Sequence, residues 1–239
     1  MADELSKTIQ MKIQDKDGNW VILYPKTKLE CILGAENIQE QINSLNEEIE
    51  NLKYKAITIT KFTSNVNVIE IGSTVSKTVL TWTLSTTPAT QNINNTIINN
   101  SLRTYTSSES YKTDKTFKLT VTDSKNATAS QSITVRFYNG VYYGASSSTT
   151  YNSTLISGFT KALTNTKART ITVNAGTGQY IYYCIPSRFG TCTFTVNGFN
   201  GGFDKVSTIS FKNLSGYSEN YDIWKSTNPS LGNTKITIS

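Results

Sequence analysis

The stretch Phe117–Phe137, FKLTVTDSKNATASQSITVRF, contains two runs of alternating apolar and polar residues separated by a short polar turn. Successive side chains of a β-strand point to opposite faces, so each run places its apolar residues on one face of a sheet. These residues are Phe117, Leu119 and Val121 in the first run, and Ile133, Val135 and Phe137 in the second. The stretch therefore predicts an antiparallel β-hairpin with one buried face.

The segments that precede this hairpin have the same character. AITITKF, NVIEI and SKTVLTWTLS are strand-like and are separated by polar turns, and alternation places Leu80, Trp82 and Leu84 on one face. We therefore expect residues 56–138 to form one β-sandwich, with Trp82 in its core. No Cys…Trp…Cys spacing is present, so a disulfide-type immunoglobulin domain is excluded.

Residues 139–239 predict a second β domain that is rich in aromatic residues. Nine of the 13 tyrosines lie from Tyr138 onward. Strand-like segments are ARTITVNAG, QYIYYCIP, GTCTFTVNGF, KVSTISFKN and NTKITIS, and they are joined by Gly- and Asn-rich turns. A short helix is possible within NSTLISGFTKALTN. The predicted fold class is thus mainly β, with two consecutive β-sandwich domains.

The N-terminal region, residues 1–35, predicts a hairpin followed by a linker. Alternating apolar residues flank the turn DKDGN, first Ile9, Met11 and Ile13, and then Trp20, Ile22 and Tyr24. DKDGN could also suggest a calcium loop, but the EF-hand pattern needs glycine at its sixth position and Gly18 is fourth. A tight turn, for which Asp-Gly supplies the positive φ, is therefore the expectation.

Residues 36–55 contain the chain's one strictly spaced helical segment, ENIQEQINSLNEEIENLK. Its apolar residues recur in steps of four and three, with isoleucine at the a positions, which is typical of a coiled coil. They are Ile38, Ile42, Leu45, Ile49 and Leu52. The alternative is an ordinary surface helix, which usually has a wider apolar stripe. The narrow stripe favours a coiled coil that joins several chains, although dimer and trimer are both open at this point.

The charge distribution, the lack of a long apolar segment and the cysteine content limit which partners and which cellular compartment we expect. The net charge is +6, but residues 1–55 carry −3 and residues 139–239 carry +5. No run of Lys/Arg and no basic helix is present, so nucleic acid is not expected as a partner. No segment has the roughly 18 apolar residues of a membrane span, and the first residues do not resemble a signal peptide, so synthesis in a cytoplasm is expected. An odd number of cysteines, Cys31, Cys184 and Cys192, favours free thiols.

The chain has no histidine, which removes Ser-His-Asp and Cys-His catalysis and nearly all catalytic zinc sites. A carboxylate pair could still serve a glycosidase, and Glu219 and Asp222 lie three residues apart. We expect them in a solvated loop instead. NAGTGQY lacks the residues that follow a phosphate-binding glycine loop and predicts a hairpin turn. We therefore expect no enzyme activity, no cofactor and no metal.

The order of these elements resembles tail-fibre and other appendage proteins of bacteriophages that infect Gram-positive bacteria. The resemblance rests on GNWVILYPKTKLE, the heptad helix, a hairpin similar to the last one of bacterial immunoglobulin-like domains, and the Tyr- and Gly-rich stretch that ends with ENYDIWKSTNPSLGNT. It implies a homotrimeric virion component, released by lysis, whose N-terminus binds other virion proteins. It carries over no catalytic residues.

Two functions then remain, binding of a host cell-surface polysaccharide and a purely structural role in tail, neck or head. Exposed aromatic rings stack on sugar rings, and polar side chains bond their hydroxyls. The net +5 of residues 139–239 suits an anionic wall polymer. The candidate glycan contacts are Tyr142 and Tyr143 in GVYYGASS, Arg188 in the turn PSRFG, and Trp224 in YDIWKS. Gly and Ser flank the first three, which we therefore expect in loops.

Overall fold

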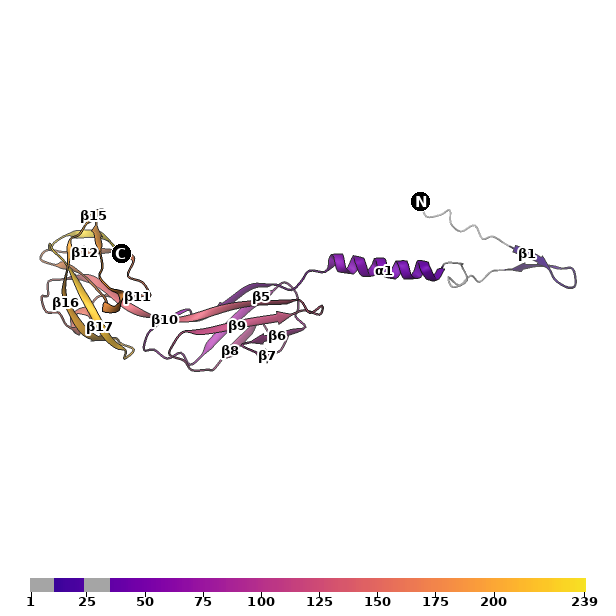
Figure 1. Ribbon diagram of the computed structural model, residues 1–239, viewed down its shortest axis with the longest axis horizontal. Coiled ribbons are helices and arrows are strands. Elements are labelled where there is room, and N and C mark those ends of the chain that lie inside the picture. The colour runs from indigo at the N-terminus through magenta and orange to yellow at the C-terminus, as the bar shows by residue number, and fades with distance from the viewer. Residues whose placement is uncertain (1–10, 24–34) are drawn as a thin grey trace. The chain divides into compact units, whose positions relative to one another are not determined.

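The computed structural model describes residues 11–23 and 35–239 (Figure 1). The chain is mainly β, with several antiparallel sheets. It divides into two compact units, Met1–Lys55 and Ala56–Ser239. Three residues named above lie outside the described residues: Ile9, Tyr24 and Cys31. Most of the predicted linker lies outside them as well.

The first unit contains the expected hairpin. Strand β1 (Met11–Gln14) pairs with antiparallel β2 (Trp20–Leu23). The backbone N–H of Asp15 donates to the carbonyl of Asn19 (2.8 Å), and Gly18 has a φ of +81°, which glycine adopts without strain. The Asp15 carboxylate accepts a hydrogen bond from the backbone N–H of Asn19. This bond is the main reason that the pKa of Asp15 is lowered. The turn prediction is thus confirmed.

Helix α1 (Ala35–Lys53) follows and covers the predicted helical segment. It ends where the backbone N–H of Tyr54 donates to the carbonyl of Asn51 (3.2 Å). Every residue from Ile38 to Lys53 is exposed in the single chain. Among the described residues, therefore, no element covers any face of this helix.

Two β layers enclose the core of the first β part, which comprises strands β3 to β9 and the first half of β10. One layer is an antiparallel sheet of β3 (Ile59–Ser64), β5 (Thr78–Leu84) and β8 (Thr104–Ser107). The other has the order β10-β9-β6-β7. Its bounds are β10 (Thr128–Ser146), β9 (Lys115–Thr122), β6 (Thr90–Ile93) and β7 (Thr96–Ile98).

The alternating residues meet between these layers, as the sequence predicted. Leu80, Trp82, Phe117, Leu119 and Val121 are all buried in one cluster, whereas the predicted inward residues Leu84, Ile133 and Phe137 are partly buried at its edge. The indole N–H of Trp82 donates to the side-chain oxygen of the buried Gln91 on β6 (3.2 Å), which joins the two layers. The arrangement is compatible with an immunoglobulin-like domain.

Strand β10 belongs to two sheets in succession (Figure 1). Its first half, Thr128–Val135, pairs with β9, and its residues Arg136–Tyr138 pair in parallel with β4 (Val68–Glu70). Its second half then pairs with two strands that follow it in the chain, β11 (Thr160–Thr164) and β13 (Tyr180–Pro186). The predicted boundary after residue 138 therefore falls inside one uninterrupted strand.

The second β part comprises the second half of β10 and strands β11 to β18. Its larger sheet continues from β10 and β13 to β17 (Ser218–Ser226) and β16 (Phe203–Lys212). Its smaller sheet has the order β12-β18-β14-β15. The bounds are β12 (Arg169–Ala175), β18 (Gly232–Ile238), β14 (Phe194–Val196) and β15 (Phe199–Asn200). Strand β17 lies where the sequence suggested a loop.

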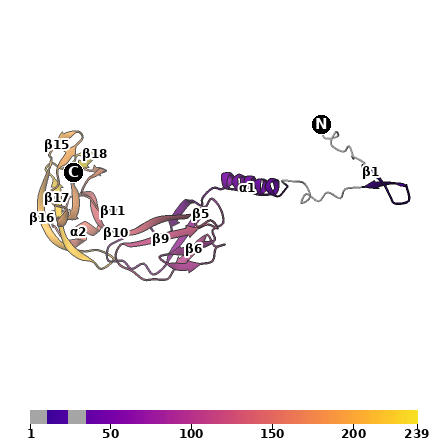
Figure 2. The same ribbon diagram turned by 45° about the vertical axis from the view of Figure 1, so that its right-hand side comes forward.

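The larger sheet is covered on both faces, which explains its continuous apolar runs. Odd-numbered residues of β13, such as Tyr183, pack against the smaller sheet. Even-numbered ones, such as Tyr182, pack toward the short helix α2 (Ser153–Ser157), which lies beside β16 (Figure 2). Helix α2 occupies only the start of the segment in which a helix was thought possible, because β11 takes up the rest.

A polar junction ties the two β parts together besides β10. The Glu70 carboxylate on β4, whose side chain is 9% exposed, pairs with the ammonium of Lys161 on β11 (3.0 Å). The side-chain amide of Asn213, after β16, donates to the carbonyl of Ile71 (2.8 Å). Each contact joins residues far apart in the chain, so the second unit is held as one compact body.

Candidate functional site

The five predicted oligomerisation residues lie on one stripe of α1. Their exposed fractions in the single chain run from 45% for Ile42 and Ile49 to 79% for Leu52. Polar side chains fill the positions between them, and both side chains of the Glu50–Lys53 ion pair (3.4 Å) are exposed, by 72% and 68%. Most helix stability in proteins comes from packing of an apolar face, and no described element packs on this stripe, so the stripe is a candidate surface for contact with another chain.

The structure corrects two of the four predicted glycan contacts. Tyr142 is only 4% exposed, and its ring centroid lies 5.1 Å from that of Phe211 and 6.0 Å from that of Tyr221. Trp224 is 7% exposed and lies 5.3 Å from the ring of Phe194. Neither ring can stack on a sugar in this fold. Tyr142 was expected in a loop because glycines flank it, but those glycines lie on β10 itself.

Tyr143 also lies on β10, directly after Tyr142, and faces the opposite side of the sheet. It is partly buried and packs against the cluster that contains Trp224. Its strand neighbours are Tyr183 on β13 and Thr160 on β11. Tyr143 therefore contributes mainly to the core, and it does not line the cleft that Arg188 lines.

Arg188 is the predicted contact that does reach solvent, with 54% of its side chain exposed. It lies in the short 3₁₀-helix η2 (Ser187–Phe189) directly after β13. Its Nε donates to Oε2 of Glu219 (3.0 Å), and its Nη2 donates to the side-chain oxygen of Asn139. The amide of Asn139 in turn donates to Oε1 of Glu219. The three side chains form a closed triangle of hydrogen bonds.

The hydrogen bonds of this triangle hold the edge of the Arg188 guanidinium that carries Nε and Nη2. Asn139 is 2% exposed and the side chain of Glu219 is 13% exposed, so both partners are held by the fold. Burial raises the pKa of Glu219, and the positive charge and hydrogen bond of Arg188 oppose that rise. The Arg188 guanidinium also lies 5.0 Å from the centroid of the Phe189 ring, which supports its plane. Arg188 is thus held in place before any ligand binds.

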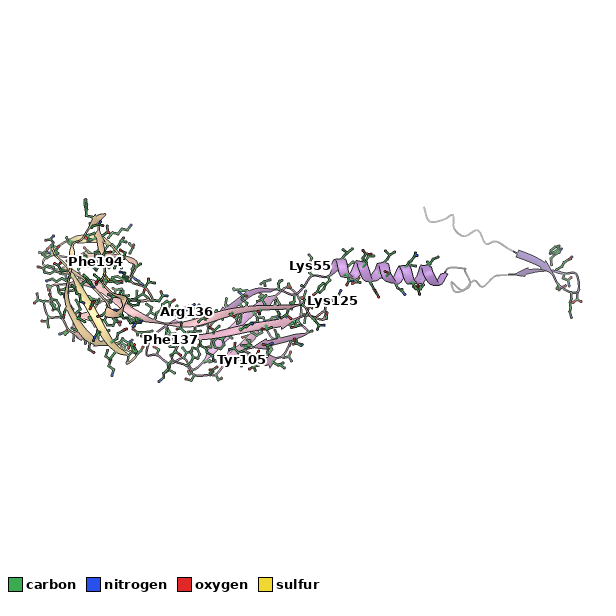
Figure 3. The ribbon with its side chains drawn as sticks, in the orientation of Figure 1. Lys55, Tyr105, Lys125, Arg136, Phe137 and Phe194 are labelled. Atoms are coloured by element: carbon green, nitrogen blue, oxygen red, sulfur yellow. The ribbon has the colours of Figure 1, made fainter. Side chains whose placement is uncertain are left out.

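A cleft of about 190 Å³ opens beside this arginine, and its walls come from four segments of the second unit. A second guanidinium, that of Arg136 on β10, lies 3.6 Å from the carboxylate of Asp114, and both side chains are half exposed. Figure 3 labels Arg136 and Phe137 on the stretch of β10 between its two sheets. The lining residues are Asp114, Arg136, Phe137, Tyr138, Asn139, Thr164, Asn165, Arg188 and Phe189. Sequence reasoning missed Arg136, because it appears there as an ordinary strand residue.

The carboxylates that could have formed a catalytic pair do not meet. Glu219 and Asp222 lie three apart on strand β17, which places them on opposite faces of the sheet, and the expectation of a solvated loop is wrong. Asp222 is 4% exposed and accepts hydrogen bonds from the hydroxyls of Ser187 (2.6 Å) and Thr208 (2.8 Å). Burial alone would raise its pKa, but these bonds and that of Lys205 hold it below its usual value. Asp222 therefore has a structural role.

Two further cavities lie in the second β part. One of about 410 Å³ is lined by residues around α2, including Asn152 and Phe159. Another of about 500 Å³ lies beside β14 and includes Cys192 and Phe203. Neither has a charged side chain in its lining.

Cys184 and Cys192 are both free thiols, as the sequence predicted, and both are buried. They belong to different core clusters on opposite faces of the larger sheet. Burial raises the pKa of the Cys192 thiol to about 11 and that of Cys184 further still, which suppresses the reactive thiolate.

We therefore expect native protein at pH 8, treated with iodoacetamide without reductant, to leave Cys184 and Cys192 unlabelled. In urea both should be labelled completely. Peptide mass spectrometry checks this for each thiol separately. A Cys184–Cys192 disulfide peptide, or rapid labelling of either residue in the native state, would contradict the burial seen here.

Within residues 11–23 and 35–239 no group of three or more His, Cys, Asp or Glu side chains is placed to hold a metal ion. No helix in the described part of the chain is both long enough and apolar enough to cross a membrane. Comparisons with protein-family models, with curated proteins and with solved structures found no match to this chain.

Proposed function

We propose that this chain is a homotrimeric virion appendage protein, of the tail-fibre type, from a bacteriophage that infects Gram-positive bacteria. The observation that carries the proposal is the a/d stripe of α1, of which 45–79% is exposed while the second unit has cores of its own. A helix that is apolar on one narrow stripe and uncovered in the single chain is suited to joining copies of that chain.

In this proposal each region has one task. Residues 1–35 bind other virion proteins, and residues 36–55 form a three-stranded coiled coil that sets the symmetry axis. An immunoglobulin-like domain, residues 56–138, and a C-terminal Tyr/Gly-rich β domain, residues 139–239, then carry a host-binding surface. Isoleucine at a with leucine at d favours two strands in isolated coils. The resemblance to phage appendages favours three, and β domains can override so short a seam.

Trimer formation would strengthen binding to a repetitive cell-surface polysaccharide, because three weak sites act together. Linked sites can raise apparent affinity by about 10²–10⁴ when the geometry lets them engage at once. The basic second unit suits an acidic wall polymer, since it carries 16 Lys/Arg against 7 Asp/Glu. No hydrolysis is part of the proposal, because Glu219 and Asp222 lie on opposite faces of the sheet and each is bonded to other side chains.

Fluorescently labelled protein applied to a panel of Gram-positive strains tests this function. We expect binding to some strains, and binding at least about tenfold weaker for an Ile42→Asp chain that cannot trimerise. Electron microscopy of gold-labelled phage particles should place the protein on an appendage. Absence of cell binding on every strain, with labelled particles, would favour a purely structural fibre instead.

A further inference from the structure

We infer that the cleft between Arg136 and Arg188 binds an anionic group on a saccharide, either a phosphate or a carboxylate. The kind of polymer rests on the proposed host-binding function. The site itself rests on the two guanidinium groups, their supporting residues and the aromatic and amide side chains around them.

Arg188 is prepared for a bidentate or end-on contact with an oxyanion. Glu219 and Asn139 use its Nε and Nη2, whereas its Nη1 makes no hydrogen bond to any described residue. A free arginine loses rotamer freedom when it binds a ligand, and an arginine already held by buried partners loses less. The planar guanidinium matches the spacing of phosphate and carboxylate oxygens better than a lysine ammonium does.

Arg136 supplies the second positive charge. Its pairing with Asp114 is loose, at 3.6 Å, and both side chains are about half exposed, so a ligand oxyanion can compete for it. Asp114 is anchored separately, because its Oδ1 accepts the backbone N–H of Phe137 (2.7 Å). The negative charge of Asp114 repels an anionic ligand, so removal of that charge should strengthen ligand binding.

The remaining lining suits the uncharged part of a sugar. Phe189 and Tyr138 are partly buried and line the cleft with aromatic carbon, while the exposed Asn165 offers an amide. The hydroxyl of the buried Thr164 is already bonded to the backbone of Thr166. The cleft is smaller than the roughly 300 Å³ at which pockets for drug-sized ligands begin. It therefore accommodates a charged group with part of one sugar ring, as expected for one contact along an extended polymer.

The test uses the full chain and three immobilised polymers in biolayer interferometry. Polygalacturonate presents carboxylates, phosphorylated dextran presents phosphates, and unmodified dextran is neutral. We expect the unaltered chain to bind at least one acidic polymer at least about tenfold more tightly than dextran, and the preferred one identifies the ligand's anion. Arg188→Gln and Arg136→Gln should each weaken that binding by about tenfold, since each removes a charge-assisted contact.

Three further variants separate this site from diffuse charge. Lys118→Gln removes the same charge from an exposed position of β9 outside the cleft, and should change affinity less than about twofold. Arg188→Lys keeps the charge but loses the planar fork, and should weaken binding nearly as much as Arg188→Gln. Asp114→Asn should strengthen binding severalfold, because a repelling charge is removed while the Phe137 contact can persist.

Equal losses in Lys118→Gln and Arg188→Gln, or no loss in the arginine variants, would overturn the inference. If the protein binds bacterial cells but neither acidic polymer, the inference fails and the proposed function stands. If it binds an acidic polymer through this cleft but no cells, the inference stands and host binding fails. Should Arg188→Gln not fold, as judged by circular dichroism, the half-exposed Arg136 and Asp114 variants decide the question.

Discussion

An Ile42→Asp chain is expected to be monomeric under conditions in which the unaltered chain is a trimer. In the proposed coiled coil Ile42 occupies an a position, so the substitution places three carboxylates around one axis without partners. An uncompensated buried charge costs roughly 3–5 kcal/mol, and the short seam has little else to hold it together. We therefore expect association to weaken at least about a hundredfold.

Sedimentation velocity on the full chain measures this effect, and Ser44→Asp is the matched control. Ser44 lies at an outward position of the same helix and is exposed, so the same added charge should leave the trimer intact. A monomer with Ser44→Asp as well would indicate general charge repulsion rather than a broken seam. An Ile42→Asp chain that keeps the mass of the unaltered chain would show that this stripe is not the interface.

Trp82→Ala is expected to destabilise the second unit by about 3–5 kcal/mol. Trp82 is 2% exposed and spans the two layers of the first β part, and its removal also takes the indole N–H from the buried Gln91. Because β10 belongs to both β parts and Glu70 bridges to Lys161, we expect the loss to appear throughout residues 56–239 as one cooperative transition.

Trp224 reports on the second β part, and the chain has only three tryptophans. In a Trp20→Phe, Trp82→Ala chain, therefore, fluorescence during urea unfolding comes from Trp224 alone. Its midpoint should fall by on the order of 2 M urea relative to a Trp20→Phe, Trp82→Phe chain, which keeps an apolar ring in the core. An unchanged Trp224 midpoint would mean that the two β parts unfold independently.

The periodic parts of the fold could be predicted from sequence. The hairpin around Asp15–Asn19, the helix with its stripe, and the alternating strands of the first β part all follow from spacing, because the apolar residues of each recur with the period of a strand or a helix. Alternation fails where both faces are covered. Strand β17 was missed for this reason, since its residues Tyr221–Trp224 are all buried and follow a polar start.

The candidate cleft was harder to predict because its parts come together only in the folded chain. Arg188 was identified from its position in a probable turn, but its partners Glu219 and Asn139 lie 31 and 49 residues away. Arg136 was missed, since a strand arginine carries no local signal of a binding site. Tyr142 was wrongly assigned to the surface. The glycines near it in the sequence indicated a loop, but β10 continues through them.

The mass of the unaltered full chain in solution tests the central proposal most directly. Multi-angle light scattering should give three times the chain mass of 26.5 kDa, which is the mass of a homotrimer formed through α1. A mass of one chain at all accessible concentrations would contradict the account, because it would leave the exposed apolar stripe without the partner that the proposed function requires.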